Sequence, residues 1–204
     1  MTELAVWSCP DNFGDLLGPE ILRRLGYRVR QVKASEADLV ACGSVIEMIA
    51  PTAREGCIVW GSGLMYPKTA DVSKLDVRAV RGRLSADLLG LKVPLADPGV
   101  LVPLLWDQPP ARRRIGVVRH YVDEGDYAWA DGQIDTRHPV DEVIDFIGSC
   151  ERVVSSSLHG LVVASAWGIP CVRVHHAEVL GGNFKWMDWM TGDADPDALV
   201  GLLP

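Results

Sequence analysis

Residues 151–175 read ERVVSSSLHGLVVASAWGIPCVRVH, and this stretch decides the fold class. The apolar run Glu151–Val154 predicts a strand, the three serines after it predict a turn, and Leu158–Trp167 predicts an apolar helix. A second β-branched run, Cys171–His175, predicts another strand. A strand, a helix and a strand in such quick succession are typical of a parallel sheet with helical crossovers, so we expect an α/β protein.

The same alternation runs outward through the rest of the chain. Before residue 91 we predict strands at Leu4–Trp7, Arg28–Val32, Leu39–Cys42, Cys57–Trp60 and Asp76–Val80, with helices at Pro19–Leu25, Val45–Ile49 and Leu84–Leu89. After residue 111 we predict strands at Arg114–His120 and Gln133–Thr136, a helix at Val140–Cys150, and closing helices at 183–190 and 196–203.

A proline-rich segment, 91–111, interrupts this rhythm and predicts a join between two parts. We therefore expect two small Rossmann-like halves, an N-terminal one at 1–110 and a C-terminal one at 111–204. The two halves either face each other across a cleft or merge into one continuous sheet, and the sequence leaves both arrangements open.

Composition excludes several classes of protein. The 204 residues are 48% hydrophobic with a mean hydropathy of +0.12, which is enough for a packed core. The formal net charge of −7 disfavours nucleic acid as a partner, because binding phosphate backbones needs a basic face. No apolar run is long enough to cross a bilayer, and residues 1–9 lack the basic start of a signal peptide, so we expect a cytoplasmic protein.

The cysteines and histidines do not predict a metal site. The five cysteines are odd in number, none stands at C-x-x-C spacing, and each lies in or beside an apolar run, so we expect buried reduced thiols. His175 and His176 are adjacent on a predicted strand and point to opposite faces. We therefore expect no bound metal and no divalent metal requirement.

The strongest candidate site is the turn Ser155-Ser156-Ser157-Leu158-His159-Gly160. Ligands in open α/β sheets bind at the carboxyl ends of strands, where helix N-termini offer free N–H groups to anions. The serines add hydroxyl donors, and His159 adds a group that exchanges a proton near neutral pH. The competing interpretation is a helix cap followed by a core histidine.

Two further turns carry polar or flexible residues after predicted strands. Asn12-Phe13-Gly14-Asp15 forms a polar loop after the first strand, with Asn12 and Asp15 as candidate ligand contacts. Gly61-Ser62-Gly63 follows the strand that ends at Trp60, and its glycines let backbone approach a ligand closely. Ordinary turn chemistry competes with both interpretations.

Three basic residues complete the candidate set. Arg81 stands between a predicted strand and a helix, and Arg119-His120 ends another strand. An arginine in such a place can form paired hydrogen bonds with a carboxylate or a phosphate, although a surface arginine is the commoner case. We expect Arg81, Arg119, His120 and His159 to approach one region and to form a positive pocket in an acidic protein.

In this order along the chain, these residues resemble the polysaccharide pyruvyl transferase family. The likeness includes Asn12–Asp15, Gly61–Gly63, Arg81-Gly82 with Ser85, Asp97-Pro98-Gly99, Ile115–Tyr121, Ser155–Gly160, Ala166–Pro170 and Lys185–Asp188. The resemblance implies a glycosyltransferase-B-like arrangement of the two halves and transfer of a pyruvyl group from phosphoenolpyruvate to a sugar. It makes His159 the leading catalytic residue, His120 a second one, and Arg81 a phosphoenolpyruvate ligand.

The resemblance also implies partners and shows departures. The acceptor is a sugar or a lipid-linked saccharide, which allows peripheral contact with a membrane-bound acceptor, and no cofactor is needed. The chain is shorter than is usual for the family. Many relatives carry an arginine where this chain has Ser157, so Arg119 or Arg83 would have to substitute for it. A nucleotide-sugar-dependent glycosyltransferase and a non-catalytic sugar- or phosphosugar-binding protein remain alternatives.

Overall fold

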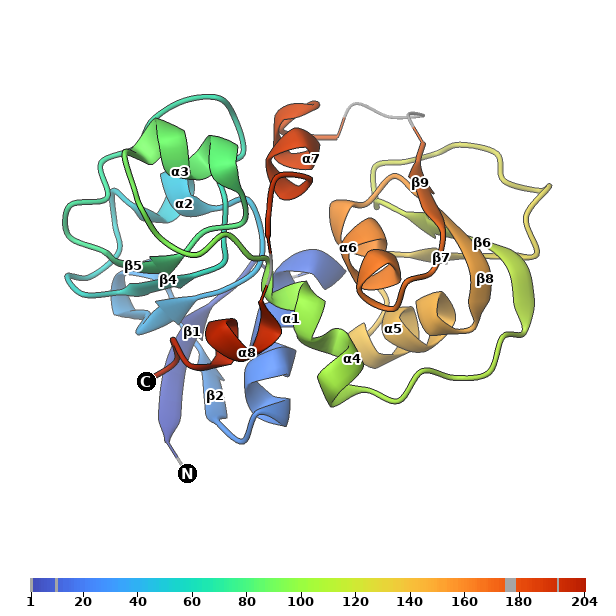
Figure 1. The fold of residues 1–204 in the computed structure, drawn as a ribbon, viewed down its shortest axis with the longest axis horizontal. Coiled ribbons are helices and arrows are strands. Elements are labelled where there is room, and N and C mark those ends of the chain that lie inside the picture. The colour runs from blue at the N-terminus through green and yellow to red at the C-terminus, as the bar shows by residue number, and fades with distance from the viewer. Residues whose placement is uncertain (1, 10, 175–178, 194) are drawn as a thin grey trace. The chain divides into compact units, whose positions relative to one another are not determined.

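The computed structural model describes residues 2–9, 11–174, 179–193 and 195–204, and it contains two separate parallel sheets (Figure 1). The five-stranded sheet has the order β2-β1-β3-β4-β5, and its strands are β1 (Glu3–Trp7), β2 (Arg28–Gln31), β3 (Leu39–Val40), β4 (Ile58–Trp60) and β5 (Asp76–Ala79). The four-stranded sheet has the order β7-β6-β8-β9, and its strands are β6 (Arg113–Arg119), β7 (Gly132–Asp135), β8 (Cys150–Ser155) and β9 (Cys171–Arg173).

Helices connect the strands in both sheets. They are α1 (Phe13–Arg24), α2 (Ile46–Ile49), α3 (Arg83–Leu89), α4 (Val102–Leu105), α5 (Val140–Gly148), α6 (Leu158–Ala166), α7 (Phe184–Trp189) and α8 (Pro196–Val200), with 3-10 turns η1 (Ala34–Glu36) and η2 (Pro98–Leu101). The pairings within both sheets are parallel, which confirms the predicted α/β class and is consistent with two Rossmann-like halves. The strands do not merge into one continuous sheet.

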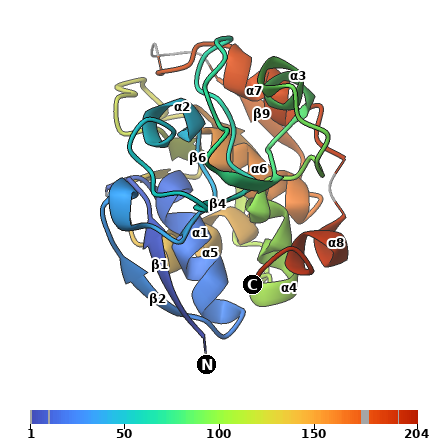
Figure 2. The same ribbon diagram turned by 90° about the vertical axis from the view of Figure 1, so that its left-hand side faces the viewer.

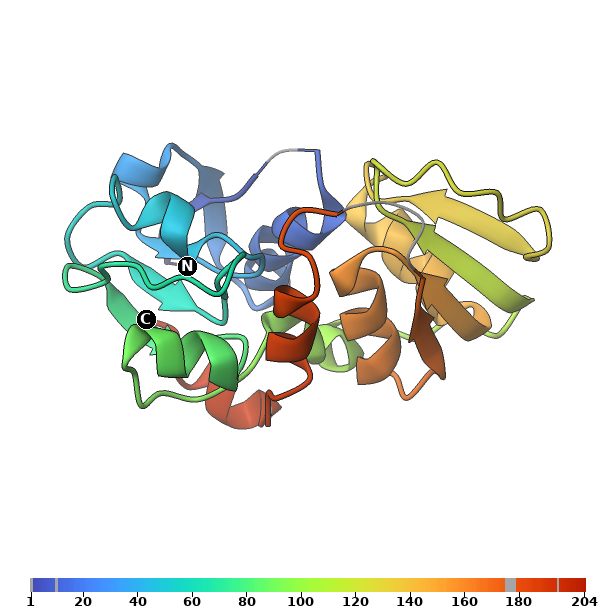
Figure 3. The ribbon, with the colours of Figure 1, turned by 90° about the horizontal axis from the view of Figure 1, so that it is seen from above.

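The chain forms two compact units, and their boundaries differ from those of the expected halves 1–110 and 111–204. Unit 1 contains Met1–Ser8, Gly18–Pro98 and Gly181–Pro204, and unit 2 contains Cys9–Leu17 and Gly99–Leu180. The C-terminal residues belong to unit 1 because they bond to its sheet: the indole N–H of Trp60 on β4 donates to the carbonyl of Leu199 at 2.9 Å. In Figure 3, the C-terminal segment is drawn in red, and its helix α7 lies beside the green α3, which it contacts.

The core of unit 1 lies where helices cover its sheet. Val40 and Val59 on the central strands are buried with Ile46 and Ile49 of α2. Figure 2 shows α7 beside α3, and these two helices contact each other. Helix α1 comes close to this sheet because Gly18 has no side chain: an added Cβ would lie 2.5 Å from the Cβ of Ala41.

In unit 2, α5 and α6 pack together against the sheet (Figure 1). Helix α6 is apolar on nearly all sides, and its residues from Leu158 to Ala164 are buried, as expected for a helix inside a core. Gly160 allows its close approach to the strands. A Cβ at this position would lie 2.4 Å from the Ser155 hydroxyl and 3.0 Å from the Val118 side chain.

One local prediction was wrong. The segment Asn12–Asp15 is not a loop, because α1 begins at Phe13 rather than near Pro19. The proline-rich join contains η2 and α4, since Pro103 occupies an early helical position where its missing N–H costs nothing. His175 and His176 lie outside the described residues, so the expectation about them stays untested.

The remaining expectations concern the thiols and membrane spans. All five cysteines are free; Cys42, Cys57 and Cys150 are buried and the other two are half-buried. Burial raises the pKa of the Cys57 and Cys150 thiols to about 11, so both are protonated at neutral pH. Among the described residues, none of the helices has the length and apolar character needed to cross a membrane.

Candidate active site

The second unit brings several predicted residues to one edge of its sheet. Strand β6 ends at Arg119 and β8 ends at Ser155, and the parallel register pairs Val118 with Ser155. The carboxyl ends of neighbouring parallel strands meet at the same edge, so Arg119, His120 and the serine turn are neighbours there. These are the strand ends at which the sequence predicted a site.

The serine turn is tightly bonded. The Ser155 hydroxyl donates to the carbonyl of Val118 at 2.8 Å and accepts from the backbone N–H of Ser157 at 2.9 Å. The Ser156 hydroxyl accepts from the backbone N–H of His120 at 2.9 Å. Both hydroxyls therefore fix the turn, and Ser157 stands as the extended residue before α6 without a capping bond from its side chain. The Ser156 hydroxyl accepts in its bond with His120 and keeps its own proton for donation, so an anion at this turn can use it together with the N–H groups of the helix start.

His159 lies in the first turn of α6, and its ring is held against the backbone of Gly14. A Cβ added at Gly14 would lie 2.2 Å from Nδ1 and 2.8 Å from Cγ of the imidazole. Real Cβ atoms do not approach other heavy atoms so closely, so a residue with a side chain at position 14 would displace the ring. Two motifs 145 positions apart, at Gly14 and His159, thus meet within unit 2.

The Gly14 segment is itself fixed to the sheet. The backbone N–H of Phe13 donates to the carbonyl of Thr136, just beyond β7, at 2.7 Å. Asn12 begins helix α1: its carbonyl accepts from the N–H of Asp15 at 3.0 Å, and its side-chain amide donates to the Asp15 carboxylate at 2.8 Å. Asn12 and Asp15, predicted to contact a ligand, therefore shape the helix start that holds the His159 ring.

Arg119 carries a donor that the described residues do not use. Its Nη1 donates to the carbonyl of Asp123 at 3.3 Å, whereas its buried Nε has no hydrogen-bond partner among the described residues. The nearest register partner, Asp135, is engaged with Arg137 through an ion pair of 2.7 Å. A buried N–H without an acceptor is costly, and an anionic ligand would satisfy it.

Sequence reasoning missed three buried polar residues near this edge. Asp123 accepts from the Tyr127 hydroxyl at 2.6 Å, and burial together with this bond raises the pKa of Tyr127, so the phenol stays protonated. Thr136 is fully buried, and its hydroxyl has no hydrogen-bond partner among the described residues. These three residues lie in or next to connections where the pattern of apolar residues is weak, so periodicity gave no signal for them.

His120 is buried at the start of the same connection. Its Nδ1 lies 3.4 Å from the backbone N–H of Val122, and its ring centroid is 4.3 Å from that of Tyr121. Its backbone N–H holds the serine turn, as described above. His120 thus belongs with Arg119 and the serines in unit 2, whereas Arg81 belongs to unit 1.

In unit 1, Arg81 forms a fully buried ion pair with Asp188 of α7. Nε and Nη2 lie 3.0 and 2.9 Å from the same carboxylate oxygen, and both side chains are 0% exposed. Nη2 also donates to the carbonyl of Leu64 at 2.8 Å, and Nη1 donates to the Ser44 hydroxyl. All three guanidinium nitrogens therefore have internal acceptors, which supports a structural role. The expected contact of Arg81 with phosphoenolpyruvate stays a prediction.

The neighbouring motifs enclose this ion pair. Asp188 also accepts from the N–H and the hydroxyl of Ser85, at 2.7 and 2.6 Å. A Cβ on Gly82 would lie 1.8 Å from the carbonyl oxygen of Asp188. Arg81, Gly82 and Ser85 thus form the binding site of the Asp188 side chain, whose role no pattern in the sequence had indicated.

The turn Gly61-Ser62-Gly63 lies against the Arg81 side chain of this ion pair. A Cβ on Gly63 would lie 2.5 Å from the Arg81 guanidinium, so this glycine makes room for it. Gly61 has a φ of +81°, a conformation that glycine adopts without strain. The Ser62 hydroxyl donates to the carbonyl of Gly43 at 2.9 Å. These contacts are internal to unit 1, and a role of the turn in ligand binding stays a prediction.

The fold and these strand-end residues define an α/β protein of the kind that holds small ligands at the carboxyl edges of parallel sheets. The chain belongs to the polysaccharide pyruvyl transferase family, whose model matches residues 6–176. The matched region includes both ends of the contact between Gly14 and His159, and the Arg81 motif as well.

Two curated relatives are similar to the chain. One is the succinoglycan biosynthesis protein ExoV of Rhizobium meliloti (strain 1021), which is 31% identical over an alignment of 193 residues that covers 87% of this chain and 60% of the relative. The other is the uncharacterized protein L143 of Acanthamoeba polyphaga mimivirus, which is 26% identical over an alignment of 165 residues that covers 70% of this chain and 57% of the relative. The chain thus spans about 60% of the length of these relatives. Family membership supports a transferase.

Proposed function

We propose that this protein transfers a pyruvyl group from phosphoenolpyruvate to two hydroxyls of a saccharide, and forms a ketal with release of phosphate. The observation that carries the proposal is the imidazole of His159, which Gly14 holds in place beside the strand edge that bears Arg119. A proton-transfer group and a buried cationic donor within one unit are what this donor substrate needs. Membership of the family adds support.

The proposed reaction needs no redox step. An acid protonates the methylene carbon of phosphoenolpyruvate, and the neighbouring C2 becomes electrophilic. One sugar hydroxyl attacks C2 and loses its proton to a base. A second hydroxyl then attacks C2, the bond from C2 to the phosphate oxygen breaks, and phosphate leaves. The products are the pyruvate ketal and inorganic phosphate.

The residues of unit 2 divide these tasks. His159 is the acid that protonates the methylene carbon, and the same imidazole can take a hydroxyl proton afterwards. Arg119 binds the phosphate or the carboxylate through its Nε, which has no acceptor in the part of the chain that the structure describes, and takes the place of the arginine found before Leu-His in many relatives. His120 and the N–H groups at the start of α6 assist with the remaining charge.

We further propose an arrangement of the two units, an acceptor and a cellular location for the reaction. Both units would adopt a glycosyltransferase-B-like arrangement, and the acceptor would be a sugar of a polysaccharide precursor, free or linked to a lipid at a membrane surface. The reaction would take place in the cytoplasm, without a cofactor or a metal ion. None of the proposed steps needs redox or Lewis-acid chemistry.

The decisive experiment is phosphate release from phosphoenolpyruvate across a panel of saccharide acceptors. We expect release that depends on both substrates and is unchanged by a chelator. Release that a chelator abolishes and a metal ion restores would refute the metal-free mechanism. Turnover with nucleotide-sugars instead of phosphoenolpyruvate would favour a glycosyltransferase, and saccharide binding without turnover of either donor would favour a non-catalytic binding protein.

Arg119→Ala should weaken phosphoenolpyruvate binding. Loss of a charge-assisted hydrogen bond costs about 1.5–3 kcal/mol, so the dissociation constant should rise roughly tenfold to a hundredfold. Isothermal titration with phosphoenolpyruvate measures it. Arg152→Ala is the matched control, since Arg152 is an exposed residue of β8. Equal affinity of the Arg119 variant and the parent would remove Arg119 from the proposed site.

Gly14→Ala should lower turnover although it exchanges glycine for a better helix former. Alanine normally stabilises a helix by about 1 kcal/mol relative to glycine, but here its methyl group occupies the space of the His159 ring. A displacement of about 1 Å can cost about a hundredfold in rate. The measurement is kcat and KM, with Gly201→Ala as the control because its added Cβ would lie 3.5 Å from its nearest neighbour. Full turnover by Gly14→Ala would show that the contact does not position His159.

A further inference from the structure

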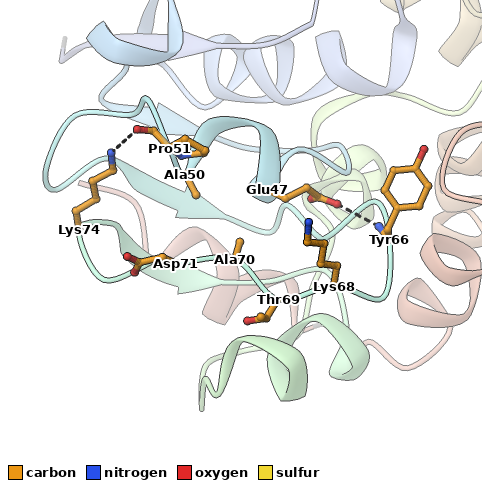
Figure 4. Close-up of a pocket in the computed structure, with 9 residues that line it drawn as sticks. All are labelled: Glu47, Ala50, Pro51, Tyr66, Lys68, Thr69, Ala70, Asp71 and Lys74. Atoms are coloured by element: carbon orange, nitrogen blue, oxygen red, sulfur yellow. Dashed lines mark hydrogen bonds between the residues drawn. The ribbon is translucent and has the colours of Figure 1, made fainter.

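A cavity in unit 1 is lined by residues other than those that form the Arg81 ion pair, and it has no part in the site described so far. Its volume is about 620 Å³, within the usual range for small-ligand sites. It lies between the end of α2 and the connection from β4 to β5 (Figure 4). Glu47, Ala50 and Pro51 line it from the α2 side, and residues 66 and 68–71 with Lys74 line it from the connection.

The charges in this cavity balance. Glu47 and Asp71 contribute two carboxylates, and Lys68 and Lys74 contribute two ammonium groups. Asp71 accepts from the backbone N–H of Ser73 at 3.0 Å, and this bond lowers the pKa of its carboxyl. The Lys74 ammonium is engaged with the carbonyl of Pro51 at 3.0 Å. Such a balanced set does not favour a multiply charged anion, which needs an excess of cations, but it suits a neutral ligand with many hydroxyls.

Glu47 is held in a fixed orientation. Its Oε1 accepts from the backbone N–H groups of Met65 and Tyr66, at 2.7 and 3.1 Å. Its Oε2 is buried and has no hydrogen-bond partner among the described residues. A buried carboxylate oxygen without a donor is destabilising, and a ligand hydroxyl would supply that donor.

An aromatic ring stands at the same end of the cavity. Tyr66 is 47% exposed, and Figure 4 shows its ring near Glu47 and Lys68. Tyrosine presents an apolar face together with a polar hydroxyl, and the C–H face of a sugar ring can pack on such a surface while its hydroxyls bond to neighbouring carboxylates. The apolar floor of Ala50, Pro51 and Ala70 adds contact area.

We propose that this cavity binds a sugar residue of the saccharide on which the protein acts. Glu47 accepts hydrogen bonds from ring hydroxyls, Tyr66 packs on the ring, and Lys68 and Asp71 bond to further hydroxyls. That this saccharide is the acceptor of the pyruvyl group rests on the proposed function, whereas sugar binding by the cavity does not.

The test is a titration of the full chain with a panel of neutral tetrasaccharides that differ in sugar and linkage, in the absence of phosphoenolpyruvate. Glu47→Gln replaces Oε2 by a group that cannot accept a hydrogen bond but retains an oxygen for Met65 and Tyr66. Tyr66→Ala removes the exposed ring. We expect each variant to bind at least about tenfold more weakly than the parent with an unchanged melting temperature. Glu55→Gln, an exposed acid outside the cavity, is the matched control and should bind as the parent does.

The outcomes separate this proposal from the proposed function. Equal affinity of all variants, or no tetrasaccharide binding by the parent, overturns the sugar site even if phosphate release is observed. A gain in phosphoenolpyruvate affinity in Glu47→Gln would also overturn it, in favour of an anion site. Saccharide binding that depends on Glu47, without phosphate release under any condition, supports the cavity and refutes the transferase. If the parent protein both binds the saccharide and releases phosphate, Glu47→Gln should raise KM for the saccharide and leave kcat unchanged.

Discussion

Substitution of His159 by glutamine is expected to lower turnover by roughly 10²–10⁴-fold, the loss that follows when a general acid is removed. Glutamine has a similar size and keeps a hydrogen-bonding end, so it should fit against Gly14 without a clash. Phosphoenolpyruvate binding should change much less than turnover, because Arg119 remains. The measurements are kcat, phosphoenolpyruvate affinity and melting temperature on the same preparation.

The competing interpretation of His159 is a core histidine that only packs against α1. In that case, His159→Gln would lower the melting temperature and leave turnover per folded molecule intact. His138→Gln is the matched control, since His138 belongs to unit 2 and its half-exposed ring contacts Glu142 at the surface, at 3.2 Å. A folded and fully active His159→Gln protein would disprove the catalytic role.

Arg81→Ala should destabilise the protein by about 3–5 kcal/mol, the cost of leaving one member of a buried ion pair without its partner. The variant leaves the Asp188 carboxylate fully buried, and among the described residues the donors that remain to it are the N–H and the hydroxyl of Ser85. Chemical denaturation measures the change in the free energy of unfolding. Arg23→Ala is the control, since its pair with Glu20 is exposed and should contribute at most about 1 kcal/mol.

A second substitution tests the physical cause. Asp188→Asn in the Arg81→Ala background removes the unpaired charge and should restore part of the lost stability. A stable Arg81→Ala protein with weakened phosphoenolpyruvate binding would contradict a structural role of the Arg81 ion pair. It would make Arg81 the substrate ligand that the family resemblance implies.

The sequence was sufficient for the fold class because the signals for it are local. The run from Glu151 to Val154, the serine turn and the apolar helix after it correspond closely to β8 and α6. Alternating strands and helices require parallel pairing, since the crossover returns each strand in the same direction. Element ends were harder to place: α1 begins at Phe13 because Asn12 starts the helix, in a segment that was interpreted as a polar loop.

The residues of the candidate site were also visible in the sequence, but their partners were not. The order of motifs identified His159, Arg81 and Arg119 as residues of interest. It did not show that Gly14 makes room for the His159 ring. Nor did it show that the Asp188 carboxylate bonds to Arg81 and Ser85 and lies against Gly82. Both contacts join positions more than 100 residues apart.

The sequence by itself determined the α/β class, the strand-end position of the polar residues and the family. The tertiary structure decided which arginine has an unused donor. A guanidinium at a strand end has the same local sequence signal whether it is buried against Asp188, as Arg81 is, or has an Nε without an acceptor among the described residues, as Arg119 does. That difference depends on burial and on acceptors supplied by distant segments, and such terms exist only once the chain is packed.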